Sequence, residues 1–309
     1  TQAGIRLQGA TVRGRINLDG LCGNTSQGLP PLHLTQCEFD DGISACNAVI
    51  AELNLDNALF TTQSTIAQDT PPIHLDNCKM MGSVRISGIR GVTDTVPIWI
   101  SARGARIQGS VIVSNSRFFY QARRIRGIDD KREFALNFSG SSIERGISAT
   151  SNLQCIGGFN IADAHIDSDV WLLGCHFIGG EGAAFRALSL QLNGNLIIRP
   201  AEDELKKEVV DSIIEGSVNL HSATISGGLY LSGVKILDHP FQGDPGVHNL
   251  SVSAVSAKIG SVFLASLWIG VTGESRAFST TKKIELTAST IGGSVNFNGS
   301  NIGASANNN

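Results

Sequence analysis

Large apolar residues recur along this chain at steps of five and six residues, and the cycle restarts after an insertion of variable length. The last cycle shows the pattern in Ile284 and Leu286, then Ile291, then Val295 and Phe297, then Ile302. A step near five fits neither the period of an α-helix nor the alternation of a long hairpin. It is typical of a solenoid with short straight sides, each burying one or two residues before a corner.

Composition agrees with a β-rich chain that has many tight corners. The 309 residues include 35 glycines, and only 17% are charged. A formal net charge of −3 argues against both a general nucleic-acid binder and a strongly acidic mimic of DNA. No apolar run is long enough to predict a transmembrane segment. The chain begins at Thr1 without a Met, which suggests processing or a longer parent and leaves export and localisation open.

The repeat predicts four sides per coil and about eleven coils. The first side carries two large inward residues separated by one outward residue, which is the signature of a strand. Its central residues are Leu7, Leu34, Leu55, Leu75, Ala102, Phe138, Ile161, Ala187, Leu220, Ala254 and Leu286. The second side carries one large residue preceded by a small one. Its centres are Val12, Phe39, Phe60, Met80, Ile107, Ile143, Ile166, Leu192, Ile225, Ile259 and Ile291.

The third side again carries two large residues, and the fourth side is less regular. The third-side centres are Leu18, Ala45, Ile66, Ile86, Val113, Ala149, Leu172, Ile198, Leu231, Leu264 and Phe297. Wide and narrow sides therefore alternate, which lets side chains fill the interior of each coil. We predict an all-β fold over residues 1–309: a single domain formed by a right-handed, four-sided parallel β-helix.

Corners and insertions complete this prediction. In many coils a glycine stands two residues after the second-side centre, as Gly82, Gly109 and Gly194 do. At this corner we expect a backbone conformation that a Cβ atom would oppose. The insertions are expected to collect at one corner, and they are 22–31, 119–134, 199–213, 237–249 and 270–283. Within the insertion 199–213, residues 201–212 predict a short helix. Acidic residues come first and lysines follow, which is the order that the helix dipole favours.

Elements such as Ala10-Thr-Val12, Ala105-Arg-Ile107, Ala164-His-Ile166 and Ala223-Thr-Ile225 resemble the units of pentapeptide-repeat proteins, which place a small residue two before a large one. The resemblance covers nearly the whole chain and implies a right-handed four-sided β-helix. The six-residue step and the frequent insertions depart from that family. The chain also resembles bacterial β-helical proteins labelled membrane-associated oxidoreductases, but it contains no GxGxxG after a strand and no CxxC.

The six cysteines predict no zinc or redox site, since none forms a CxxC pair. Cys37, Cys78 and Cys175 fall at inward positions where other coils hold Ala or Ser, so we expect small core residues. Buried free thiols favour a reducing compartment.

The outward residue beside each third-side centre is the strongest indication of function. Four successive coils place Trp171, Ile197, Tyr230 and Phe263 there, flanked by Leu173. A solvent-facing apolar ladder indicates a contact surface, either for a partner or another copy or for a covering segment of the same chain. Strand edges at the two ends of such a solenoid would also be open to pairing.

Two further sets of residues are weaker candidates. The loop residues Arg123, Arg124, Arg126, Lys131 and Arg132 could bind phosphate or an acidic partner, although such runs are more often solvated loops. Asp56 and Asp76 are expected at one outward position of adjacent coils, with Arg103 on the next. That pair could bind calcium or serve in catalysis, but an ion-pair ladder with arginine is favoured.

The leading hypothesis is therefore a non-catalytic scaffold that self-assembles or docks a protein partner through the apolar ladder and its ends. It needs no cofactor and no nucleic acid. One alternative is a carbohydrate-active or ligand-binding β-helix that uses the loop corner with Asp56 and Asp76. Another, implied by the resemblance, is a DNA-mimicking pentapeptide-repeat protein acting on a topoisomerase.

Overall fold

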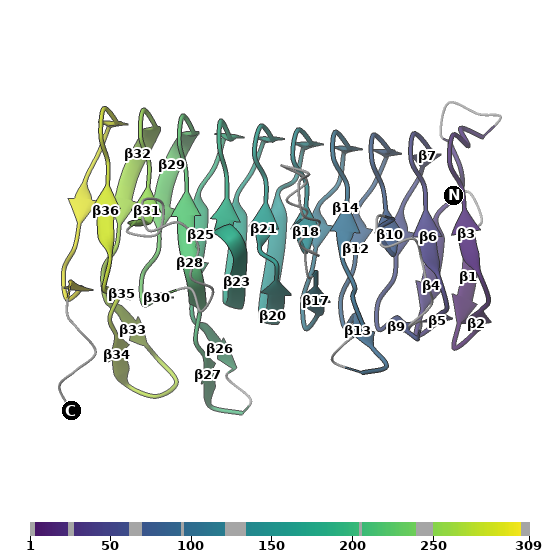
Figure 1. Ribbon diagram of the computed structural model, residues 1–309, viewed down its shortest axis with the longest axis horizontal. Helices are drawn as coiled ribbons and strands as arrows, with labels where there is room; N and C mark the ends of the chain where they lie inside the picture. Colours follow the sequence, from purple (N-terminus) through teal and green to yellow (C-terminus); the bar gives the residue numbers. More distant parts are fainter. Residues whose placement is uncertain are drawn as a thin grey trace.

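The computed structural model describes residues 4–23, 28–61, 70–93, 96–120, 134–203, 206–238 and 250–303. Every regular element in these ranges is a β-strand, which confirms the prediction of an all-β chain. Figure 1 shows the strands stacked along the long axis of the molecule, with the N-terminal and C-terminal strands at opposite ends.

Most strands pair in parallel with strands one repeat away in sequence, and these pairs form four columns, which we name A to D. The chain passes through the columns in the order A, C, B, D and then returns to A. Parallel pairing of short strands from successive repeats is compatible with a β-helix. All inward side chains described below project from these four columns.

Column A extends from Ile5, paired with Leu32, to Val262, paired with Val295. The strands found in this column alone are β1 (Ile5–Gln8), β4 (Leu32–Thr35), β8 (Leu53–Asn54), β12 (Val84–Arg85), β16 (Val111–Ile112), β25 (Leu196–Arg199) and β38 (Val295–Asn296). Five longer strands continue from one column into another: β20 (Ile147–Ile156), β23 (Val170–Arg186), β28 (Ile213–Asn219), β29 (Thr224–Tyr230) and β32 (Lys258–Phe263).

Column B carries the other wide side. Its own strands are β3 (Arg15–Asn17), β6 (Gly42–Ser44), β10 (Ile73–His74), β14 (Ile100–Ser101), β18 (Leu136–Asn137), β21 (Phe159–Asn160), β31 (Leu250–Ser253) and β36 (Lys283–Glu285).

Columns C and D carry the remaining sides. Column C contains β2 (Thr11–Val12), β5 (Glu38–Phe39), β9 (Leu59–Phe60), β13 (Arg90–Gly91), β17 (Arg117–Phe119), β30 (Lys235–Leu237), β35 (Ser279–Thr280) and β39 (Asn301–Ile302). Column D contains β7 (Val49–Ile50), β11 (Lys79–Met80), β15 (Arg106–Ile107), β19 (Ser142–Ile143), β22 (His165–Ile166), β24 (Gln191–Leu192) and β37 (Thr290–Ile291).

The pairing confirms the predicted alignment over most of the chain. Ile107 pairs with Ile143, Ile143 with Ile166, and Ile166 with Leu192, so these residues form one continuous stretch of column D.

The expected alignment is wrong by half a repeat near residue 70. Ile73 pairs with Ile43 and not with Leu53, which instead pairs with Val84. The strand at Ile73 therefore completes the repeat that begins at Leu53, whereas the sequence analysis starts a new coil there. Columns A and B present the same spacing of two large residues, so the pattern does not distinguish them. Ile66, the expected third-side residue of that coil, lies outside the described residues.

The interior is a continuous apolar core along the stack. Phe159 lies at its centre, with ring centroids 6.1, 6.0 and 5.6 Å from those of Phe138, Phe177 and Phe185. Small residues precede the column D centres and are buried; they include Ala105, Ala164 and Cys78. The small residues of column D thus leave room in the core for the aromatic rings of the other columns. Cys37, Cys78 and Cys175 are buried, as predicted.

Glycine at the column D corners is required for close approach between backbones. A Cβ on Gly109 would lie 2.4 Å from the Gly82 carbonyl carbon and 2.5 Å from Ser83 N. Gly109 itself has no left-handed φ. The left-handed corner falls elsewhere in the repeat, after columns A and B, where Asn57 and Asn77 have φ of 58° and 55°. Asparagine tolerates this conformation better than most residues.

Residues 201–203 and 208–210 form an antiparallel hairpin, so the expected helix over 201–212 is wrong. Ala201 in β26 (Ala201–Asp203) pairs with Val210 in β27 (Glu208–Val210). Both side chains lie against Gly174, where a Cβ would stand 2.9 Å from that of Ala201 and 3.0 Å from that of Val210. This packing of the hairpin onto the core strand outweighs the helical propensity of the charged residues.

A second hairpin, β33 (Leu267–Ile269) with β34 (Glu274–Arg276), projects from the same side of the stack (Figure 1). The two hairpins are joined by a hydrogen bond of 3.1 Å from Val271 N to Glu202 Oε2. Both lie between columns A and C, whereas the segment after Leu237 leads from column C to column B. The expectation that all insertions share one corner is therefore wrong.

Candidate association surface

The four predicted ladder residues lie next to one another on the outer surface of column A. Trp171 pairs with Ile197, Ile197 with Tyr230, and Tyr230 with Phe263. All four lie after residue 73, so the half-repeat error does not affect their alignment. They are not equally exposed, because Trp171 is 36% exposed but Ile197 is only 8% exposed. The expectation that every ladder residue faces solvent is thus wrong for Ile197.

Trp171 is held in place by charged neighbours. Its indole Nε1 donates to Asp169 Oδ2 at 3.2 Å, and the Arg199 guanidinium lies 5.7 Å from its ring centroid. Leu173 is half-buried and pairs with Arg199 in the next repeat. Part of the apolar surface at this end of the ladder is therefore covered by the protein's own arginine.

Tyr230 and Phe263 form the other half of the ladder. Their rings are parallel, with centroids 4.7 Å apart and planes inclined by 2°. Tyr230 also lies over Gly228, where a Cβ would stand 2.4 Å from the ring. Each ring covers a face of the other, so the pair presents ring edges outward.

The two ends of the stack expose residues whose counterparts inside it are buried. Ile5 is 51% exposed in β1, while its partner Leu32 is buried. Val295 is 45% exposed in β38, while its partner Val262 is buried. Leu7 and Leu21 near the first end, and Phe297 and Ile302 at the other, are also exposed. The sequence predicts open strand edges at the ends, but it does not single out these residues.

Trp268, on the second hairpin, is the most exposed large apolar side chain among the described residues, at 67%. Sequence reasoning missed it. The available signal was alternation along a strand: Trp268 stands next to Ile269, an inward position, and Ile269 is fully buried in the structure.

Asp56 and Asp76 do not share an outward position. Asp56 follows β8 in column A and accepts from Arg85 Nε at 3.1 Å. Asp76 follows β10 in column B, where Arg103 Nη2 donates to it at 2.7 Å. The half-repeat error is the reason that the sequence analysis placed them side by side. The favoured arginine partner for Asp76 is correct, whereas the weaker alternative, adjacent carboxylates that bind calcium or serve in catalysis, is wrong because the two residues lie in different columns.

Asp76 is the most strongly perturbed carboxylate of the described residues. Burial by itself favours its neutral form, but hydrogen bonds from His74, Arg103 and Ser101 outweigh this and hold its pKa well below the usual range. All of these donors belong to column B, and the carboxylate is 8% exposed. The arrangement indicates a structural ion pair.

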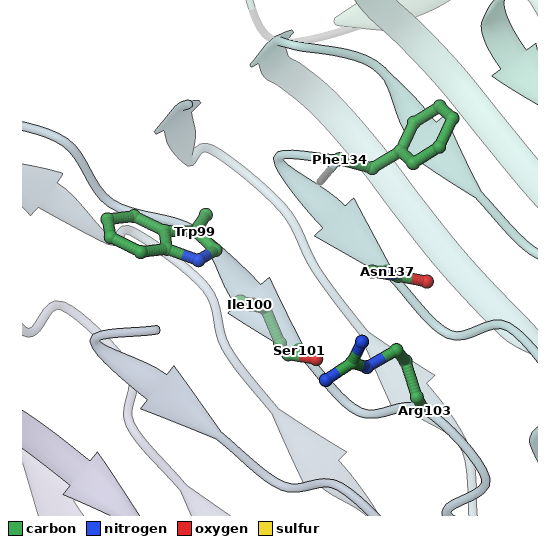
Figure 2. A pocket seen from close by; sticks show the side chains of 6 residues that line it. All are labelled: Trp99, Ile100, Ser101, Arg103, Phe134 and Asn137. Carbon is green, nitrogen blue, oxygen red and sulfur yellow. The ribbon is translucent and has the colours of Figure 1, made fainter. Parts of the chain in front are cut away.

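A shallow depression lies beside this ion pair. Figure 2 shows its lining residues, which are Trp99, Ile100, Ser101, Arg103, Phe134 and Asn137. Its space of about 180 Å³ includes open solvent, so the enclosed part is much smaller, whereas ordinary ligand sites begin at roughly 300 Å³. The depression is too small to enclose a typical organic substrate.

The basic loop residues Arg123, Arg124, Arg126, Lys131 and Arg132 lie outside the described residues. Within the described part of the chain, no three His, Cys, Asp or Glu side chains gather in a group able to hold a metal ion. Nor do the described ranges contain a helix with the length and apolar character needed to cross a bilayer.

Comparison with protein-family models, with curated protein sequences and with solved structures found no match for this chain.

Proposed function

We propose that this protein is a non-catalytic β-helical scaffold that associates with copies of itself, or with a protein partner, through its ends and its apolar ladder. In this proposal the four columns are the sides of one right-handed solenoid of about eleven coils. Right-handed connection is the rule for parallel strands joined by crossovers.

Two features support the proposal, and the aligned outward residues of column A, Trp171, Tyr230 and Phe263, are the observation that carries it. The inward residues of columns A and C are exposed in the strands β1, β38 and β39, although their counterparts in the middle of the stack are buried. Exposed apolar surface next to unpaired strand edges favours association with another edge.

The apolar ladder offers a second, lateral contact. Trp171, Tyr230 and Phe263 project in one line along column A, and aromatic side chains are enriched at protein contacts. Ring orientation is fixed before binding by Asp169 and by the Tyr230–Phe263 stack. Such preorganisation lowers the entropy cost of association.

Assembly state tests this proposal directly. We expect large particles or filaments from the wild-type chain by light scattering and electron microscopy. Val295→Asp should reduce end-dependent assembly, and Tyr230→Asp or Phe263→Asp should reduce lateral assembly. Thr224→Asp, which changes an exposed polar residue on the column D part of β29, is the matched control and should leave particle size unchanged. A wild-type chain that stays strictly monomeric at high concentration would overturn the self-association.

A further inference from the structure

We infer that the depression beside the Asp76–Arg103 ion pair binds a small carboxylate anion, of the size of formate or acetate. This inference goes beyond the proposed scaffold function and does not depend on self-association. It rests on Trp99 and Asn137, two buried side chains that line the depression. Each carries an N–H group that no described residue accepts.

The depression forms where two short outward side chains lie between two long ones on column B. Ser101 in β14 pairs with Asn137 in β18, and both are buried although they point outward. Trp99 and Arg103 stand two residues before and two residues after Ser101, so they project from the same face of the sheet. Figure 2 shows Ser101 between these two larger side chains.

Trp99 provides the first donor without a partner. Its side chain is 4% exposed, and its indole Nε1 is buried and makes no hydrogen bond. Figure 2 shows this nitrogen on the edge of the ring that is nearer to the other lining residues. A buried N–H group without an acceptor costs free energy, and an acceptor bound in the depression would recover it.

Asn137 provides the second donor, and its neighbours fix the orientation of its amide. Its Oδ1 accepts from Ser139 N and from Asn160 Nδ2, both at 3.1 Å. These bonds identify the oxygen, which Figure 2 shows directed away from Trp99. Nδ2 has no acceptor within the described part of the chain, and it is the amide atom left to donate towards the depression that Asn137 lines.

The charges around the depression favour an anion. Arg103 neutralises Asp76 through the bonds from Nε and Nη2. The Arg186 guanidinium lies 6.0 Å from the ring centroid of Phe134, which also lines the depression. These contacts place two positive charges and one negative charge near the site. Because N–H groups cannot coordinate a cation, the two donors point to the same sign of ligand.

Geometry and size favour a small carboxylate over a halide or a larger acid. Trp99 and Asn137 lie on neighbouring strands and are two residues out of register, so their Cα atoms are about 8 Å apart. The two oxygens of a carboxylate can accept from donors on both strands at once, whereas a halide offers a single atom. The limited space suits formate or acetate and excludes a larger acid.

An anion titration followed by tryptophan emission tests this inference. Sodium acetate replaces sodium chloride at constant ionic strength, and the wild-type protein should show a saturable change in emission. Acetamide, which has the shape of acetate without its charge, should produce no such change. Trp99→Phe removes the indole N–H group and should abolish the response, while Trp171 and Trp268 continue to emit.

Asn137→Asp tests the second donor without removing the bonds that hold the residue. The new side chain keeps an acceptor for Ser139 and Asn160 but replaces the NH₂ group with a carboxylate oxygen. We expect the apparent dissociation constant for acetate to rise about tenfold or more, because a hydrogen bond to a charged group is lost.

Asn219→Asp is the matched control and should bind acetate as the wild type does. The Oδ1 of Asn219 also accepts the amide of the second residue along, from His221 at 3.2 Å. Asn219 lies in the same outward row of column B, beyond Asn160 and Arg186.

Thermal melts confirm that each variant folds, and Trp99→Phe decides the question if Asn137→Asp does not fold. Absence of a saturable change in the wild type would overturn the inference, and so would an equal change with acetamide. A response that Trp99→Phe and Asn137→Asp both retain would also overturn it. Particle size is not part of this measurement, so none of these results would remove the proposed self-association.

Discussion

Arg103 donates two hydrogen bonds to one carboxylate oxygen of Asp76, from Nε at 2.9 Å and from Nη2 at 2.7 Å. Its backbone amide donates to the other oxygen, Oδ1, at 2.9 Å, and Ser101 Oγ donates to the same atom at 2.6 Å. Asp76 therefore joins two successive repeats of column B through side-chain and backbone groups. Such charge-assisted bonds at a buried carboxylate are among the stronger polar interactions in a protein.

Removal of this carboxylate should change how stability depends on pH. The pKa of folded Asp76 is held below its unfolded value, so the ionised group adds stability above about pH 4, and that stability is lost as pH falls through the folded pKa. We expect Asp76→Asn to be less stable than wild type at pH 7 and to lose less on acidification. Urea midpoints at pH 7, 5 and 3 measure this, with Asp56→Asn as the control for loss of one carboxylate. Equal acid dependence in wild type and Asp76→Asn would contradict the expectation.

Gly109→Ala should be strongly destabilising. Its Cβ would meet the backbone of Gly82 and Ser83 at 2.4 and 2.5 Å, and the backbone cannot move aside without breaking the pairing of neighbouring repeats. We expect a loss on the order of 2–4 kcal/mol, as for other steric conflicts in a packed interior. Gly292→Ala is the matched control, since the nearest atom to its Cβ would be 3.8 Å away. The measurement is the melting temperature of each variant relative to the wild type. An equal decrease for Gly109→Ala and Gly292→Ala would refute this account.

Phe159→Ala should leave a cavity in the middle of the core. The ring contacts those of Phe138, Phe177 and Phe185 and is buried, so its removal should cost about 3–5 kcal/mol. Phe297→Ala removes the same side chain from an exposed position directly after β38 and should cost much less. Chemical denaturation of both variants provides the measurement. A smaller loss for Phe159→Ala than for Phe297→Ala would show that the core is not arranged as described.

Thiol reactivity should separate the cysteines by position. Cys22 is exposed and should react quickly with an aromatic disulfide reagent at neutral pH. Burial raises the pKa of Cys78 to about 12, and it raises the pKa of Cys155 and Cys175 as well, so these thiols should react only after unfolding. Cys22→Ser should remove the fast phase. Rapid labelling of Cys155 in the folded protein, detected by peptide mass analysis, would contradict the described burial.

Much of the fold could be predicted from the sequence because each repeat buries residues of a fixed size at a fixed spacing. The alignment of Ile107, Ile143, Ile166 and Leu192 follows from this pattern, and so does the order of the ladder residues. Prediction failed where two columns look alike. Leu53 and Ile73 both begin a pair of large residues, and only their partners, Val84 and Ile43, show that they belong to different columns.

The candidate site was predictable only in part, because exposure depends on neighbours that are distant in sequence. The place of Trp171, Tyr230 and Phe263 in one line follows from alternation along strands. Burial of Ile197 and the cover that Arg199 gives to Trp171 do not follow from it. The hairpin at 201–210 shows the same limit, since its charged residues favour a helix locally and its contact with Gly174 decides otherwise.

The sequence by itself determined that this chain is built from short strands with alternating inward residues, because burial of apolar side chains at period two leaves no other regular structure. Tertiary structure alone decided which of two similar columns the strand at Ile73 joins, that Ile197 is buried, and that residues 201–210 form a hairpin. Those outcomes depend on contacts between residues about 20 to 40 positions apart along the chain, and the spacing of apolar residues does not specify a contact where two columns share the same spacing.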